Sequence, residues 1–444
     1  MEILIAAWEQ FLLLLTSPFR NGLLPFVLKF IPYVIFLELP VYFFILAGVL
    51  KWDLRRQATE PKEPPYYPRV SCIVMGYGEG RDIALSILSL AEQVYAGHVE
   101  ILALIDGARK NVETYQAARQ LQARVDQLPR RTLRIVPKWQ RGGRVSSLNA
   151  GMELATGEMV MNIDGDTSFD NDMVAKVARH FSDPNVVGVA GNLRVRNVFA
   201  SLTSRLQAVE YMLSIHLSKI GLSEFNVINN ISGAFGVYRK SFLQKIGGWD
   251  SGTAEDLDLT IRSKQYFGRH PELRLVFEPE AIGHTEVPDT FRGLLDQRLR
   301  WDGDLYYLYI RKHPLSFSPR ILGWRNMTLM LWTGLFFQIV MPLVIIIYTA
   351  YSLAAFPIDI VLALWALIYL LYLAIMVVLF TTYVTLVSER KRQDLKLLPV
   401  IPLVPVFTFA LRLWNALATL KEVAMRSHLD SSMAPWWVLK RTKF

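Results

Sequence analysis

The chain contains the stretch MVMNIDGDT, from Met159 to Thr167, a short apolar run that ends in two carboxylates on either side of a glycine. A strand buried inside a parallel sheet has this composition. Because ligands of open α/β sheets bind at the carboxyl ends of the strands, we expect Asp164 and Asp166 at the mouth of a cleft. Two hard oxygen ligands there suit Mg²⁺ or Mn²⁺ bound to phosphate, although an Asp-Gly turn after a strand is also common without a metal.

Strand-like and helix-like patterns alternate before this stretch. Apolar runs predict strands over 69–77, 99–105 and 133–137, and helical patterns occupy 83–93 and 112–125. This alternation predicts a doubly wound α/β domain with a parallel sheet.

Charged side chains follow the ends of three expected strands. Glu79, Asp106 and Asp164 each come just past a strand, so we expect them at one edge of the sheet. Residues 141–151, RGGRVSSLNAG, form a basic glycine-rich loop that runs into a helix. Such a loop suits an anionic diphosphate.

The pattern changes after Thr167. We expect strands over 186–189 and 231–238 and a helix over 202–217. Glu255 and Asp256 begin another helix, where acids are often only partners of the helix dipole. An amphipathic segment over 291–309 contains QRLRW.

The bulk composition indicates a membrane protein with one large aqueous domain. The 444 residues are 52% hydrophobic, and the apolar stretches lie at the two ends of the chain. Basic residues at 51–56 and 390–392 flank these stretches, which is the positive-inside pattern and explains the net charge of +9 without nucleic acid as a partner. The single Cys72 excludes an internal disulfide, as expected for a cytosolic domain.

Four regions follow from this composition. We expect an N-terminal transmembrane region and linker at 1–65, a cytosolic domain at 66–288, interfacial amphipathic helices at 289–323 and a transmembrane or interfacial region at 324–444.

The expected membrane segments differ in clarity. Residues 1–19 are either a short span or an interfacial helix, and 23–50 is long enough to span. Segments 327–351 and 360–387 are clear spans. Segment 397–420 contains prolines and charge and precedes a basic tail, so we expect it to be interfacial or re-entrant.

Residues from about Val70 to Trp301 resemble the membrane-embedded, processive family 2 glycosyltransferases, such as cellulose, hyaluronan, chitin and poly-N-acetylglucosamine synthases. Residues 163–166 are similar to the metal-binding D-x-D motif, and 297–301 to Q-x-x-R-W, which marks polymerising members. Glu255-Asp256 is similar to T-E-D, with Ala254 in place of Thr. The run 302–304, DGD, departs from the family pattern.

The resemblance implies a GT-A-type, Rossmann-like fold and a role for each motif residue. Asp256 would be the catalytic base with Glu255 beside it, and Asp166 with Asp164 would hold Mg²⁺ or Mn²⁺. The nucleotide-sugar would contact Glu79, Asp106, Arg144, Asp164, Arg298 and Arg300. The acceptor would contact Gln297, Trp301, Ser232 and Gly233. A polymer crossing the membrane needs a lined path, for which the candidate aromatic residues are Trp324, Trp332, Trp365 and Trp414.

The implied activity is that of a multi-pass synthase of the cell membrane. It would transfer a sugar from UDP-N-acetylglucosamine or UDP-glucose to a β-linked polysaccharide acceptor with inversion, and translocate the polymer. Membrane lipid and an accessory membrane subunit are expected partners. Two alternatives stay open: a non-processive polyprenyl-linked glycosyltransferase, which would not need 297–301, and a non-catalytic nucleotide-sugar-binding sensor or scaffold.

Overall fold

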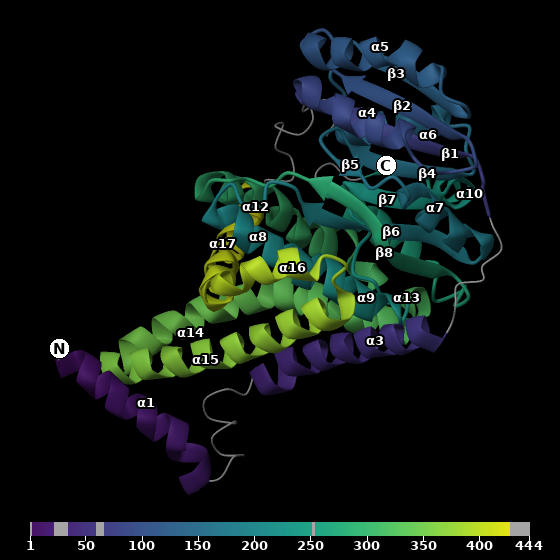
Figure 1. Cartoon of the computed structure of the whole chain (residues 1–444). Helices are drawn as coiled ribbons and strands as arrows, with labels where there is room; N and C mark the ends of the chain where they lie inside the picture. The colour runs from purple at the N-terminus through teal and green to yellow at the C-terminus, as the bar shows by residue number, and fades with distance from the viewer. Residues whose placement is uncertain (1, 22–33, 59–65, 251–253, 427–444) are drawn as a thin grey trace.

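The computed structural model describes residues 2–21, 34–58, 66–250 and 254–426. The expected span at 23–50 is therefore described only from Val34, and the linker prolines Pro61, Pro64 and Pro65 and the tail beyond Arg426 lie outside the described residues. Figure 1 shows the sheet-containing domain at one end and a group of long helices beside it.

Eight strands form one sheet. They are β1 (Val70–Gly76), β2 (Val99–Asp106), β3 (Arg131–Lys138), β4 (Met159–Asp164), β5 (Ser168–Phe169), β6 (Val186–Val195), β7 (Phe235–Arg239) and β8 (Arg274–Thr285). Their order is β3-β2-β1-β4-β7-β6-β8-β5. The first four are parallel and match the predicted strands. Every residue of β1 and β2 is buried, as expected for strands covered on both faces.

The predicted parallel sheet is confirmed for β1 to β4, whereas β7, for which no direction was predicted, runs antiparallel to both β4 and β6. The chain leaves the carboxyl end of β6, forms helices and re-enters at the same edge, so the next strand must run the opposite way. Since β4 and β6 are both antiparallel to β7, they point in the same direction. β8 is parallel to β6, so the carboxyl ends of β4, β6 and β8 share one edge.

Helices cover the sheet (Figure 1). They are α4 (Ile83–Ala91), α5 (Val112–Asp126), α6 (Gly143–Leu154), α7 (Met173–Ala178), α10 (Lys240–Lys245) and α11 (Glu255–Lys264), with 3₁₀ turns at Gly80–Asp82 and Arg179–Ser182. The predicted helices at 83–93 and 112–125 correspond to α4 and α5.

The remaining helices lie beside the domain or extend away from it (Figure 1). The predicted helix at 202–217 is longer and comprises α8 (Leu202–Glu210), a π-helical segment (Tyr211–Leu217) and α9 (Ser218–Ser223). The other helices in the described ranges are α1 (Glu2–Asn21), α3 (Leu39–Ala58), α12 (Phe291–Tyr306), α13 (Pro319–Leu329), α14 (Met341–Ala355), α15 (Ile358–Thr382), α16 (Lys391–Asp394) and α17 (Val404–Met425).

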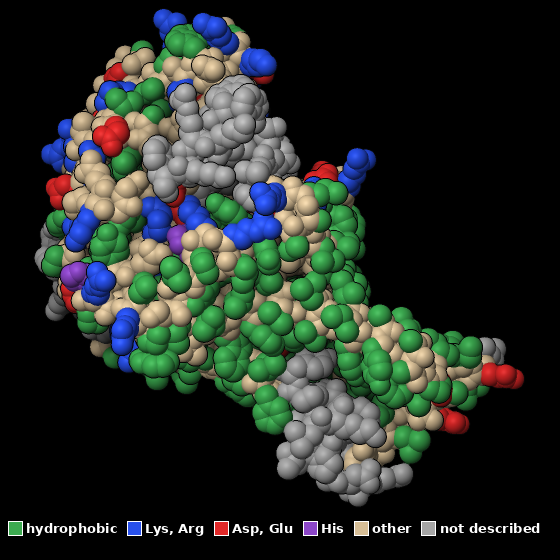
Figure 2. Space-filling view, turned by 180° about the vertical axis from the view of Figure 1, so that it is seen from behind, with side chains coloured by type: hydrophobic (Ala, Val, Ile, Leu, Met, Phe, Trp, Pro, Cys, Tyr) green, Lys and Arg blue, Asp and Glu red, His purple; other side chains and the backbone are tan. Residues whose placement is uncertain are grey.

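Four helical stretches in the described ranges are long and apolar enough to cross a membrane: Val34–Ala58, Pro319–Ala355, Ile358–Val387 and Lys391–Met425. Figure 2 shows hydrophobic side chains over these helices and Lys and Arg side chains at their border with the domain. The last stretch, expected to be interfacial, thus qualifies as a span by length and composition, and its interfacial placement stays a prediction. Pro399 and Pro402 explain why its first part is a 3₁₀ segment rather than an α-helix.

The N-terminal span packs directly against the domain. A Cβ atom on Gly48 of α3 would overlap the carbonyl of Gly221 in α9, so the two helices can approach this closely only with glycine at this contact. Lys51, one turn after Gly48, lies 3.7 Å from the carboxylate of Glu224, and Arg55, two turns after Gly48, lies 2.5 Å from it. The contact connects α3 to α9.

Candidate active site

The acids predicted for one sheet edge lie at that edge. β1, β2 and β4 are parallel neighbours, so Glu79, Asp106 and Asp164 follow strand ends on the same side. A Cβ atom on Gly165 would lie 3.2 Å from the Glu79 carboxyl carbon, which places Glu79 beside the segment that carries Asp164 and Asp166. Three carboxylates from two strand ends therefore surround one small region.

Arg144, at the start of α6, connects this region to a distant part of the chain. Its guanidinium donates hydrogen bonds to the carboxylates of Asp164 and Glu255 and, at 2.6 Å, to the carbonyl of Gly233. The planar fork of an arginine suits several acceptors held at once. Arg144 was predicted to contact the nucleotide-sugar; the structure shows that it holds two carboxylates and the segment of Ser232 and Gly233 together.

Asp256, the predicted base, lies in the first turn of α11. Its carboxylate accepts hydrogen bonds from the main-chain N–H groups of Gly233, at 3.0 Å, and of Leu257, at 2.7 Å. A Cβ atom on Gly233 would lie 2.9 Å from the Glu255 carboxylate, so the segment must carry glycine there. Ser232 accepts a weaker hydrogen bond, at 3.4 Å, from the side chain of Asn162 in β4.

Burial and mutual repulsion raise the pKa values of the acidic side chains at this edge of the sheet. Burial, followed by the charges of Asp166 and Asp164, raises the pKa of Glu79 to about 7. Burial and the charge of Asp164 raise the pKa of Asp166 to about 6. Burial is also the largest reason why the pKa of Glu255 is about 7, despite Arg144. The described basic residues therefore do not fully neutralise the negative charge at this edge.

These residues fit a hard divalent cation. Among the described side chains, no basic group forms an ion pair with the Asp166 carboxylate, while Asp164 is paired with Arg144. Carboxylate oxygens are the ligands that Mg²⁺ and Mn²⁺ prefer. The described part of the chain contains no cluster of three acidic, histidine or cysteine side chains that holds a metal by itself. The remaining ligands would therefore come from a diphosphate and water, as is usual for Mg²⁺.

Asp106 has a structural role that the sequence did not reveal. Its carboxylate accepts hydrogen bonds from the N–H groups of Gly142 and Gly143, both at 2.8 Å, and lies 2.9 Å from the Lys138 ammonium. The side chain thus fixes the glycine-rich loop at the start of α6. Its predicted contact with the nucleotide base stays a prediction.

Two of the predicted acceptor residues, Gln297 and Trp301, lie on α12. Trp301 is 41% exposed, and the guanidinium of Arg298 lies 4.8 Å from the centre of its ring. Arg298 also binds Glu210 of α8 at 2.6 Å, so in this structure it joins two helices, and its diphosphate contact stays a prediction. The Oε1 atom of Gln297 is buried without a hydrogen-bond partner among the described residues. The side chain of Arg300 lies outside the described part.

Two contacts of this site could not be predicted from the sequence. Asn162 of β4 donates a hydrogen bond of 2.5 Å to the carbonyl of Gly233. Arg196, just past β6, donates to the main-chain carbonyl of Asp166. Each pair lies far apart in the chain, and no local pattern marks it.

The chain is similar to several known glycosyltransferases. A poly-beta-1,6-N-acetyl-D-glucosamine synthase of Staphylococcus epidermidis is 34% identical over 160 residues, 36% of this chain and 38% of that protein. An N-acetylglucosaminyltransferase of Rhizobium meliloti is 30% identical over 254 residues, 55% of this chain and 57% of that protein. The chain thus spans little more than half of these curated relatives at most. A mannosyltransferase from Pyrobaculum calidifontis, solved with GDP-Man and Mn²⁺, has a TM-score of 0.47 and 20% identity, covering 87% of this chain and 97% of that one.

The family profile matches a region that contains most of the site. The profile described as glycosyl transferase family group 2 matches residues 159–383, about half of the chain. This range includes Asp164, Asp166, Gly233, Asp256 and Trp301, and the mixed sheet is of the expected GT-A type. The chain therefore belongs to glycosyl transferase family group 2.

Proposed function

We propose that this glycosyltransferase is a membrane-bound polysaccharide synthase. It transfers a sugar from UDP-N-acetylglucosamine, or UDP-glucose, to the growing end of a β-linked polymer with inversion, and moves the polymer across the membrane. The observation that carries the proposal is the position of Arg144, which joins Asp164 to Glu255. Asp164, on the proposed donor side, and Glu255, on the proposed acceptor side, therefore accept hydrogen bonds from the same guanidinium group.

The donor side is the edge formed by β1, β2 and β4. UDP would lie across Glu79 and the glycine-rich loop fixed by Asp106, with its diphosphate near the start of α6. A divalent cation held by Asp166 and Asp164 would neutralise the charge that develops on the departing diphosphate. Family 2 enzymes of the GT-A type generally use such a cation.

The acceptor side is the first turn of α11. Asp256 would take the proton from an acceptor hydroxyl as that oxygen bonds to the anomeric carbon and the bond to the diphosphate oxygen breaks. Two main-chain N–H groups hold this carboxylate in place, at 2.7 and 3.0 Å, so the base is positioned before the acceptor arrives. A single displacement inverts the anomeric centre, and an α-linked donor then gives a β-linked product.

The exposed ring of Trp301 supports an acceptor that is a sugar chain. An aromatic face packs well against the apolar face of a sugar ring, and Gln297 offers a buried oxygen that lacks a donor among the described residues. This feature favours a polymerising enzyme. The runner-up is a non-processive enzyme acting on a polyprenyl-linked acceptor, which would use the same acids but would not need 297–301.

A cavity of about 510 Å³ between the candidate spans supports a path for the product. Its lining is mainly aromatic and aliphatic and includes Tyr42, Tyr348, Trp365, Tyr369, Tyr372 and Arg412. Of the four tryptophans considered for such a path, Trp332 and Trp414 donate hydrogen bonds of 2.8 Å to main-chain carbonyls, and only Trp365 lines this cavity.

The proposed organisation follows the expected regions. Transmembrane regions at 1–65 and 324–444 and interfacial helices at 289–323 would place the domain at 66–288 in the cytosol of a multi-pass protein of the cell membrane. An accessory membrane subunit is a further proposal. Synthesis by the purified chain alone would count against a required subunit.

A donor screen tests the proposed function. The purified chain is given Mg²⁺ or Mn²⁺ and, separately, UDP-N-acetylglucosamine, UDP-glucose and UDP-glucuronate, and UDP release and product size are measured. We expect a large product from one donor, lost in Asp256→Asn and retained in the matched surface variant Asp172→Asn. Single additions to a polyprenyl phosphate would support the runner-up. UDP binding without turnover in the presence of candidate subunits would contradict both.

A further inference from the structure

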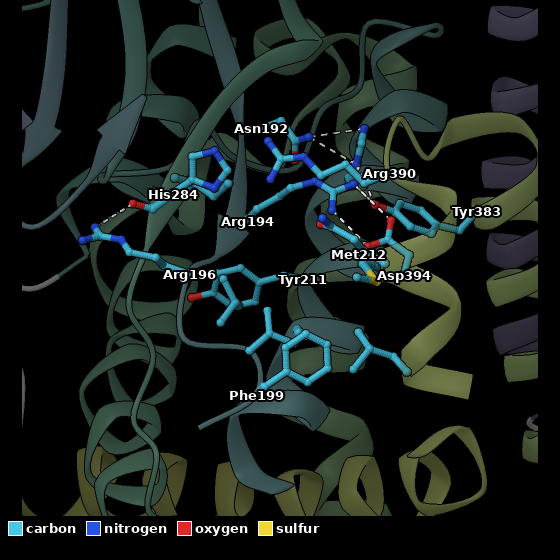
Figure 3. Close-up of a pocket in the computed structure, with 17 residues that line it drawn as sticks. Asn192, Arg194, Arg196, Phe199, Tyr211, Met212, His284, Tyr383, Arg390 and Asp394 are labelled. Carbon is cyan, nitrogen blue, oxygen red and sulfur yellow. Dashed lines mark hydrogen bonds and ion pairs between the residues drawn. The ribbon is translucent and has the colours of Figure 1, made fainter. Parts of the chain in front are cut away.

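A second cavity lies beside the candidate metal residues. It has a volume of about 270 Å³ and is enclosed by the ends of β6 and β8, by α8 with the π-helical segment after it, and by residues 383–397 at the end of α15 (Figure 3). Because β4, β6 and β8 end at the same sheet edge, this cavity continues the edge that carries Asp164 and Asp166. The run 191–196, which contains two of its arginines, resembles that of the poly-N-acetylglucosamine synthases, but no site role was predicted for either arginine.

Arg194, in β6, and Arg196, just past its end, contact different partners. Figure 3 shows Arg194 directed toward Tyr383 and Asp394 and Arg196 directed to the other side. Arg194 lies 3.1 Å from Asp394 and 2.8 Å from Glu389, and donates at 2.8 Å to the hydroxyl of Tyr383. Its charge is therefore fully paired with the segment that follows α15.

Arg196 makes mainly main-chain contacts. Its guanidinium donates to the carbonyl of Asp166 and, at 3.0 Å, to the carbonyl of His284. The nearest carboxylate among the described residues is that of Glu286, at 3.9 Å, and Glu286 is largely exposed. The Nε atom of Arg196 is buried without a partner among the described residues. The geometry is that of a clamp on the Asp166 main chain, not of an ion pair.

We propose that Arg196 is a positioning residue for the candidate metal site. By holding the carbonyls of Asp166 and His284 together, it fixes the turn after β4, so that the Asp166 carboxylate points to where the cation and diphosphate bind. The role needs an arginine, because the terminal nitrogen that donates to both carbonyls is held in place by a rigid guanidinium plane, whereas a lysine ammonium is a point charge at the end of a flexible chain. This inference rests on the metal role of Asp166 in the proposed function.

The support for Arg196 comes from a second strand. Its main-chain N–H donates to Thr285 at 2.8 Å, and the ring of His284 lies 2.9 Å from Asp170, four residues after Asp166. β5, which follows the D-x-D turn, also pairs with His284. Residues at the ends of both β6 and β8 therefore hold the turn. Residues that contact a metal ligand, without binding the metal themselves, orient that ligand in this way.

Mn²⁺ binding tests the inference with a readout other than turnover. The affinity for Mn²⁺ in the presence of UDP is measured by electron paramagnetic resonance on the full chain in detergent, together with the melting temperature. We expect Arg196→Ala to weaken Mn²⁺ binding by about 10- to 100-fold and Arg196→Lys to restore little of it. The Mn²⁺ concentration for half-maximal transfer should rise by a similar factor.

Arg194→Ala is the matched control, because it removes the same side chain from the same strand. We expect it to lower the melting temperature and leave Mn²⁺ affinity within about twofold of wild type, since it touches no part of the metal site. Equal weakening in both variants, or unchanged affinity in Arg196→Ala, would overturn the inference. Asp166→Asn distinguishes failure of the Arg196 inference from failure of the proposed metal site. If this variant binds Mn²⁺ like wild type, the proposed metal site itself is wrong.

Discussion

The main-chain N–H of Gly233 donates a hydrogen bond of 3.0 Å to the carboxylate of Asp256. The carbonyl of the same residue accepts from Arg144, which in turn holds Asp164. One glycine thus connects the candidate base to the candidate metal residues.

Gly233→Ala should impair catalysis more than folding. The added Cβ would lie 2.9 Å from the Glu255 carboxylate and 3.3 Å from the Arg144 guanidinium, so the two charged groups must shift. Overpacking of this kind costs about 1–3 kcal/mol in stability, whereas small misplacements in a site can cost about 100-fold in rate. UDP release and melting temperature are measured together, with the surface variant Asp172→Asn as the control. Normal turnover in Gly233→Ala would contradict the close approach.

Glu79→Gln should raise the melting temperature of the metal-free protein at high pH. The folded-state pKa of Glu79 is about 7, above its ordinary value, because of burial and then of Asp166 and Asp164. The folded state therefore binds more protons between those two values, and its stability falls as pH rises through them. Melting curves at about pH 5 and about pH 8 should differ less in the variant than in wild type. An identical pH dependence would show that Glu79 is not the titrating group.

Asp258→Asn should destabilise the domain, unlike Asp256→Asn. The buried Asp258 carboxylate lies 2.8 Å from each of Arg262, Lys312 and His313. The substitution leaves the buried Arg262 guanidinium without a carboxylate partner among the described residues, and breaking a buried pair costs about 3–5 kcal/mol. Despite burial, these partners hold the pKa of Asp258 far below its ordinary value, so its contribution is present above that value and is lost as pH falls in acid. Chemical denaturation of both variants checks the contrast, and equal stabilities would contradict it.

Arg412→Met should destabilise the membrane region more than the double change with Glu38→Gln. Arg412 of α17 lies 2.8 Å from Glu38, which is almost fully buried and also accepts from Tyr372 at 2.8 Å. Breaking one side of a buried pair typically costs about 3–5 kcal/mol, and removing both charges restores much of it. Melting temperatures in detergent for both single variants and the double variant measure the coupling. Additive effects would show that the two side chains act independently.

The first half of the sheet was predictable from the sequence, because local patterns of apolar residues determine where its strands lie. β1 to β4 are apolar runs separated by helices, and the acids at their ends lie at one edge for topological reasons. β8 was missed because its partner is distant and Pro279 interrupts it, which produces the register shift opposite Gly191 and Asn192. The predicted strand at 186–189 was too short, because buried Asn192 is polar and is accommodated by contacts with Pro279 and His216, which are distant in the chain.

The motifs of the site could be predicted from the sequence, but the contacts between its residues could not. D-x-D and Glu255-Asp256 are recognisable in the sequence, but their connection through Arg144 spans 111 positions. Asp106 and Arg298 were identified as charged residues near the site, and the structure shows that each has protein partners. Which partner a charged side chain selects depends on packing between distant segments, and sequence patterns do not encode it locally.

The most direct test of the account is to compare Asp256→Asn with wild type for UDP binding and for sugar transfer. UDP and Mn²⁺ affinities are measured by calorimetry, and transfer from UDP-N-acetylglucosamine by UDP release. The account predicts that the variant binds UDP and Mn²⁺ within about twofold of wild type and loses transfer by at least about 100-fold, because only the base is removed. Transfer at the wild-type rate in the variant would contradict the assignment of Asp256 as the base.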